Sequence, residues 1–155
     1  CLFRHTANFE GEYIFDQHFK NPETKSPLEY SPVPYGVFTW PQIAGVGQNE
    51  KDLKEQGVDY IVGKNSYKAS AMGMALRSNV GFVKLLFEKS SLKLLGAHIV
   101  GEQATTMIHM LIAFMNCNAT LDDLLKTIYI HPALPEIVRN AARSARKELE
   151  DAKPK

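Results

Sequence analysis

The spacing of apolar residues predicts helices at both ends of the chain. Apolar positions recur every three or four residues over 104–115 and again over 134–149, which is typical of helices that bury one face. A further helix is expected over 5–19, where apolar, aromatic and acidic residues mix without proline. Two short helices are expected after Asn49 and Thr120, because an aspartate three residues later completes a capping box in each case.

Short apolar runs in the middle of the chain predict β-strands. They cover residues 35–40, 43–47, 58–62, 80–87 and 94–100, and the polar segment between the last two indicates a β-hairpin. Residues 69–77 stay unassigned because Gly73 and several small side chains leave their conformation open. Dense prolines predict that residues 20–34 form a connecting loop. This order of elements predicts an α+β fold, with an antiparallel sheet covered by helices on one side.

The composition of the chain excludes several classes of function. Its 155 residues are 45% hydrophobic, as expected for one globular domain, and the formal net charge of +1 gives no reason to expect nucleic acid or an acidic membrane as partner. Arginines and lysines on the last helix are expected to form a solvated face. Apolar runs are too short to span a bilayer. Only Cys1 and Cys117 are present, so no disulfide framework is expected and a reducing, cytoplasmic setting is predicted.

The sequence contains no complete catalytic site of a common type. The glycine-rich fingerprints that hold dinucleotides or triphosphates, the G-x-S-x-G element of hydrolases and the H-E-x-x-H element of metalloproteases are all missing. Five histidines occur without the spacing of metal ligands, so no metal site is expected.

The segment from Tyr129 to Glu136 stands out because it carries a histidine between prolines. Pro132 favours an extended backbone at His131, so the imidazole is expected on a stiff loop. Glu136 has two interpretations. It is either an ordinary carboxylate at a helix start, or an anion that hydrogen-bonds to the imidazole and fixes its tautomer for general acid–base work. Spacing alone favours the first interpretation.

Three ordered segments resemble one known family. Residues 131–136 are similar to the H-P-[T/A]-L-x-E element of the flavoprotein pyridine nucleotide–disulfide oxidoreductases, which include dihydrolipoamide dehydrogenase and mycothione reductase. Residues 37–50 resemble the start of that family's dimerisation domain, and residues 94–101 resemble its L-L-G-A-H-I-x-G strand. Residues 4–10 resemble the last helix of its FAD domain. The resemblance divides the chain into the end of an FAD domain plus linker (1–34), a dimerisation domain (35–150) and a polar tail (151–155).

The resemblance also implies a function for the segment. It implies that His131 reaches into the active site of the partner subunit in a homodimer, as acid and base toward the thiol that exchanges with a disulfide substrate, and that Glu136 orients it. It places His131, Pro132, His5 and Thr6 next to FAD. FAD and NAD(P)H are expected in the full-length protein, and the isolated chain is expected to bind neither and to be inactive. The alternative is a structural homodimerisation module in which the His131 loop only packs.

Two departures from the family pattern limit what carries over. Tyr129 stands where the family often has another histidine, so any role of that residue is lost. The C-x-x-x-x-C redox pair and the nucleotide-binding fingerprints are not found in these residues.

Overall fold

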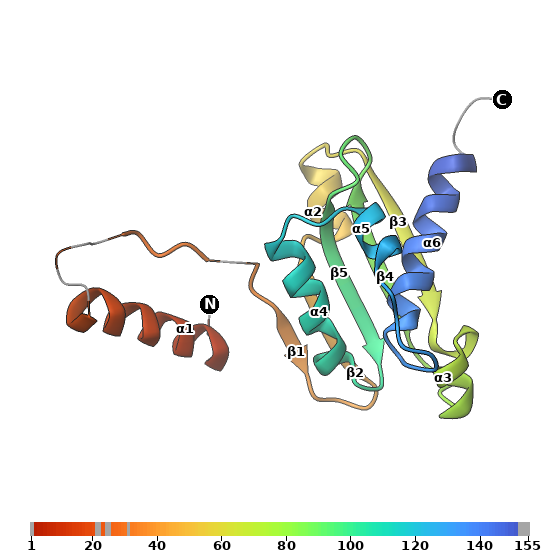
Figure 1. Cartoon of the computed structure of the whole chain (residues 1–155), viewed down its shortest axis with the longest axis horizontal. Helices are drawn as coiled ribbons and strands as arrows, with labels where there is room; N and C mark the ends of the chain where they lie inside the picture. Colours follow the sequence, from red (N-terminus) through yellow and green to blue (C-terminus); the bar gives the residue numbers. More distant parts are fainter. Residues whose placement is uncertain (1, 21–22, 24–25, 31, 152–155) are drawn as a thin grey trace. The chain divides into compact units, whose positions relative to one another are not determined.

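The chain forms two compact units, each described here by itself. The computed structural model describes residues 2–20, 23, 26–30 and 32–151, and the units meet between Val33 and Pro34. The first unit contains helix α1 (Arg4–Phe15), which continues as a π-helical turn over Asp16–Lys20 (Figure 1). The predicted helix over 5–19 is therefore confirmed. The predicted loop over 20–34 lies partly outside the described residues.

A five-stranded antiparallel sheet forms the centre of the second unit. Its strand order is β1-β2-β5-β4-β3, and every neighbouring pair runs antiparallel, which confirms the predicted α+β class and the β4–β5 hairpin. The strands are β1 (Tyr35–Val37), β2 (Gln42–Gly47), β3 (Tyr60–Ser66), β4 (Phe82–Glu88) and β5 (Leu94–Gly101). Strand β3 extends beyond the predicted 58–62, because its second half is polar and its pairing with β4 is visible only in three dimensions.

The helices follow the predicted order. Both capping boxes form: the side chain of Asn49 accepts from the Asp52 amide, and that of Thr120 accepts from the Asp123 amide. The unassigned segment near residue 70 forms a 3-10 turn followed by a short helix. The helices are α2 (Glu50–Glu55), α3 (Ala71–Ala75), α4 (Ala104–Asn116), α5 (Leu121–Lys126) and α6 (Glu136–Asp151).

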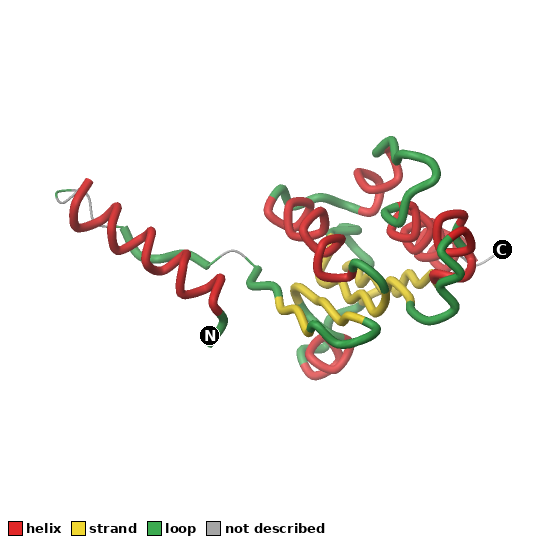
Figure 2. The backbone as a smooth tube through the Cα atoms, turned by 90° about the horizontal axis from the view of Figure 1, so that it is seen from below, coloured by secondary structure: helices red, strands yellow, loops and turns green. Residues whose placement is uncertain are grey.

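Helices α4 and α6 cover one face of the sheet, and α2 lies on the other (Figure 2). The main core lies between the sheet and helices α4 and α6. Four of its fully buried residues are Leu85, Ile99, Leu111 and Ile137. Leu53 of α2 is also fully buried but lies outside this cluster. The expectation of helices on one side therefore holds for α4 and α6 and fails for α2, a helix too short to show its own apolar stripe.

Helix α6 lies unusually close to β3 at Gly63. A Cβ atom placed on Gly63 would be 2.2 Å from the Ala141 carbonyl oxygen and 2.9 Å from the Ala145 Cβ atom. Alanines on α6 and glycine on β3 thus let the two backbones approach. Since Glu136 begins this helix, the contact also fixes where the candidate site lies.

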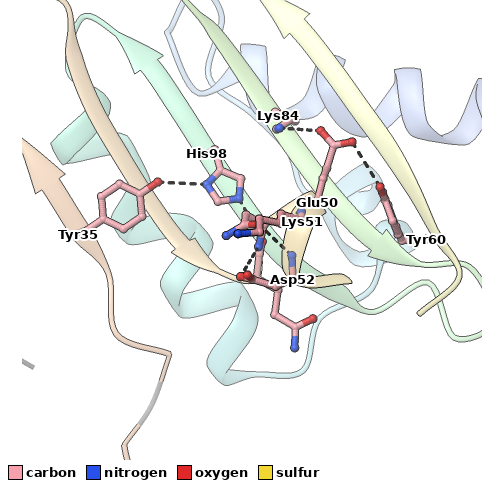
Figure 3. A network of polar contacts seen from close by, with 9 residues as sticks. Tyr35, Glu50, Lys51, Asp52, Tyr60, Lys84 and His98 are labelled. Carbon is pink, nitrogen blue, oxygen red and sulfur yellow. Dashed lines mark hydrogen bonds and ion pairs between the residues drawn. The ribbon is translucent and has the colours of Figure 1, made fainter. Parts of the chain in front are cut away.

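A polar network occupies the outer face of the sheet, beside α2 (Figure 3). The Nε2 atom of His98 lies 3.1 Å from the Gln48 carbonyl oxygen, and its Nδ1 atom lies 3.3 Å from the Tyr35 hydroxyl. Because a carbonyl only accepts, Nε2–H donates to Gln48 and Nδ1 accepts from Tyr35. Nearby, Lys84 donates to Glu50 at 2.7 Å. Burial lowers the pKa of His98, and Lys84 adds to the effect.

This network predicts that the domain loses stability as the pH falls below neutrality. The unfolded chain binds a proton to His98 near pH 6.5, whereas the folded protein does so only at lower pH. The contribution of neutral His98 is therefore complete above pH 6.5 and is lost below it, at up to about 1.4 kcal/mol per pH unit. Urea unfolding at pH 7.5 and 5.5 should show a smaller decline for His98→Gln than for wild type. Equal declines would contradict this assignment.

Candidate active site

The imidazole of His131 lies on the loop between α5 and α6, exposed on the surface of the unit. The His131 side chain is 69% exposed, and the His131–Pro132 peptide bond is cis. Ile128 and Ile130 of the same loop are also exposed, which is unusual for aliphatic side chains of this size in a folded domain. The loop therefore presents both the histidine and apolar side chains outward.

The carboxylate of Glu136 lies beneath this imidazole. The Nδ1 atom of His131 is 3.1 Å from each of the two carboxylate oxygens. One oxygen also accepts the Ala133 backbone amide at 3.1 Å, and the other accepts Arg139 Nη2 at 2.9 Å. Glu136 is only 4% exposed. A buried carboxylate with this many donors stays in one orientation.

The surroundings of Glu136 keep it ionised. The pKa of the Glu136 carboxyl lies below its usual range, chiefly because the Ala133 amide donates a hydrogen bond to it. His131 and Arg139 lower this pKa further, whereas burial raises it. Because a carboxylate only accepts, the proton of the neutral imidazole is on Nδ1. Nε2 is then the atom that can take up or release a proton, and it belongs to an exposed ring. The pair can thus act as an acid or base toward a group that approaches from outside this unit.

The predicted site residues fall in both units of the chain. His131, Pro132 and Glu136 are adjacent in the second unit. His5 and Thr6 belong to the first unit, where the His5 ring stacks on Phe3 and the Thr6 hydroxyl is buried without a partner among the described residues.

Arg139 was missed as a site residue. The sequence predicts it on a solvated face, but its side chain is only 23% exposed and is paired with Glu136. The sequence feature that indicates this contact is the position of Arg139 three residues after Glu136, since side chains at that spacing are neighbours on a helix.

Comparison with known proteins gives this geometry a context. Residues 33–142 match the model of the pyridine nucleotide-disulphide oxidoreductase dimerisation domain, which is more than half of the chain. The chain belongs to this family. In the dimerisation domain, the exposed His131 loop and its buried carboxylate are therefore parts of a known module rather than an isolated surface feature.

Several known proteins resemble the chain over most of its length. Mycothione reductase of Mycobacterium tuberculosis is 39% identical over 146 residues, which cover 90% of this chain and 31% of that protein. Mitochondrial dihydrolipoyl dehydrogenase 2 of Arabidopsis thaliana is 36% identical, covering 91% of this chain and 27% of that protein. The HOCl-induced flavoprotein disulfide reductase of Escherichia coli shares the fold, with a TM-score of 0.82, 20% identity, and coverage of 99% of this chain and 33% of that one.

The chain thus spans about a third of the length of the relatives that it matches. In the part of the chain that the structure describes, no helix is long and apolar enough to cross a membrane. No group of three metal-ligating side chains is found among those residues either.

Proposed function

We propose that this dimerisation domain supplies the His131–Glu136 pair to the active site of a partner subunit, in an FAD-dependent NAD(P)H:disulfide oxidoreductase. The observation that carries the proposal is the combination of an exposed imidazole with a buried, ionised carboxylate. A histidine that served its own domain would have its free nitrogen turned inward. Here Nδ1 lies against the buried Glu136 carboxylate and the side chain is 69% exposed, which leaves Nε2 for a group that approaches from outside this unit.

The chemistry that we propose is proton transfer during thiol–disulfide exchange. A thiolate of the enzyme attacks one sulfur of the substrate disulfide, forms a new S–S bond and expels the other sulfur as a thiolate. The His131 imidazolium stabilises the attacking thiolate and gives its Nε2 proton to the departing sulfur. Glu136 holds the ring and stabilises its positive charge. When bound, FAD would supply the two-electron chemistry that links NAD(P)H to the redox disulfide of the enzyme.

The residues proposed to border FAD are compatible with such a ligand. No hydrogen bond to the His131 carbonyl oxygen is found among the described residues, so it can accept from a group on another subunit. Pro132 is exposed next to it. In the first unit, the buried Thr6 hydroxyl has no hydrogen-bond partner among the described residues, as expected of a group that a ligand completes. His5 lies beside it in α1.

The proposal includes a homodimer, because it assigns the pair to a site on a partner subunit. The exposed apolar side chains of the His131 loop support an interface there. Cys117, which is free and exposed, fits the reducing, cytoplasmic setting that we propose. The structural alternative is a dimerisation module in which His131 has no chemical role, and the effect of His131→Ala on disulfide reduction separates the two.

The isolated 155-residue chain is expected to be colourless and unable to oxidise NADH or NADPH. The fingerprints that hold dinucleotides are missing from its sequence, so it has no means of retaining the flavin alone. The measurement is an absorbance spectrum of the purified chain, together with a pyridine-nucleotide oxidation assay. Stoichiometric flavin absorbance in the purified chain would contradict the expectation.

A further inference from the structure

The Glu136 carboxylate is itself held by the Arg139 side chain and by a backbone amide, neither of which the proposed chemistry uses. Arg139 Nη2 donates to Glu136 Oε1 at 2.9 Å, opposite the Ala133 amide, which donates to the other oxygen at 3.1 Å. The carboxylate is thus fixed from two sides. Since Glu136 is 4% exposed, water cannot readily replace the guanidinium.

Tyr129 supports the guanidinium in turn. The Arg139 guanidinium carbon lies 5.7 Å from the centre of the Tyr129 ring, within the range of a cation–π contact. The Tyr129 hydroxyl donates to the Leu124 carbonyl oxygen at 3.2 Å and so ties the ring to α5. A continuous chain of contacts therefore connects α5 with His131 through Tyr129, Arg139 and Glu136.

The arrangement is not one that maximises stability. Arg139 uses a single N–H group on the carboxylate rather than a two-bond fork, and its Nε atom is buried without a partner among the described residues. A buried unpaired donor is costly. An arginine that served packing alone would more simply pair both nitrogens or extend into water.

We propose that Arg139 is a positioning residue for the acid–base pair, and that Tyr129 is its support. Arg139 fixes the Glu136 carboxylate, and the carboxylate then fixes the exposed imidazole, whose hydrogen bonds in the described structure are those with Glu136. Without Arg139, the carboxylate can rotate and the ring can turn Nε2 away from the thiol. This inference rests on the proposed function.

The test uses the full-length, flavin-loaded dimer and the variant Arg139→Met, which keeps a flexible, unbranched side chain of shorter length and removes its donors. We expect kcat for disulfide reduction to fall about tenfold, with KM nearly unchanged, because the orientation of a reacting group is lost while substrate binding is not. Reduction of the flavin by NAD(P)H should proceed at the wild-type rate. Arg143→Met is the matched control, since Arg143 lies one turn further along α6 and is exposed.

A double variant distinguishes positioning from a structural role. If Arg139 acts through the imidazole, adding Arg139→Met to His131→Ala should lower the single-turnover rate of disulfide reduction no further. A merely structural residue would lower the rate again in that background. Arg139→Lys should recover part of the kcat, because an ammonium keeps the charge but not the planar geometry.

Each outcome separates the two proposals. If His131→Ala leaves disulfide reduction unchanged, the proposed function fails. Suppose instead that His131→Ala lowers the rate of disulfide reduction. Only the positioning role then fails if Arg139→Met behaves like Arg143→Met, or if the double variant is slower than His131→Ala alone. If Arg139→Met does not assemble with flavin, Arg139→Lys replaces it in the same comparison. We expect kcat of Arg139→Lys to be about threefold below wild type. A wild-type kcat in Arg139→Lys would overturn the inference.

Discussion

Replacing His131 with alanine in the full-length protein should slow disulfide reduction by roughly 10²- to 10⁴-fold, the usual contribution of a positioned acid or base. Reduction of the flavin by NAD(P)H should keep its wild-type rate, because the imidazole acts only on the sulfur chemistry. Stability should hardly change, since the His131 side chain is 69% exposed and loses one contact pair. Stopped-flow measurement of the two half-reactions resolves these effects.

The control for this experiment is His109→Ala. His109 is exposed on α4, and its Nδ1 atom lies 3.3 Å from the Thr106 carbonyl oxygen of the same helix. It therefore reports the effect of removing an exposed imidazole with no carboxylate partner in the described structure. Unchanged disulfide turnover in His131→Ala would favour the structural alternative.

Replacing Gly63 with valine should lower the free energy of unfolding by about 3 kcal/mol, at the upper end of the usual cost of overpacking a core. The added side chain would meet the Ala141 carbonyl oxygen, which is backbone and cannot turn aside. Helix α6 would have to move away from β3, and Glu136 would move with it. Urea unfolding of the purified chain measures the effect.

The matched control lies one residue further along β3. Lys64 faces the opposite side, exposed, with its ammonium 4.1 Å from the centre of the Phe82 ring, so Lys64→Ala should cost less than about 1 kcal/mol. If Gly63→Val is as stable as Lys64→Ala, then α6 can leave β3 without loss, and the close contact does not fix the site.

Local patterns were sufficient to predict most of the fold. The helical stripe around Leu111, the capping boxes and the β4–β5 hairpin depend on residues close in sequence, and all three are present. The second half of β3 was missed because Gly63, Lys64 and Asn65 have low strand propensity, and their strand is stabilised by pairing with β4. Tertiary pairing there outweighs the local preference.

The candidate site was predicted in part. His131 and Glu136 are close in sequence, so their contact could be suspected, but spacing alone favoured a helix-start carboxylate over a partner for the imidazole. The carboxylate does both, because it accepts the Ala133 amide and lies against Nδ1. The contact of Arg139 with Tyr129 depends on how α6 packs beside the preceding loop, which no local pattern encodes.

The central claim, that His131 serves the site of a partner subunit, is tested most directly with hybrid dimers. Full-length His131→Ala subunits are mixed, by unfolding and refolding together, with subunits whose redox cysteines have been replaced. Each parent dimer is expected to be inactive. If His131 acts across the interface, random pairing restores about a quarter of the wild-type sites, because each hybrid joins an intact histidine with an intact cysteine pair. If the histidine acts within its own subunit, the mixture stays inactive, and that result would contradict the account.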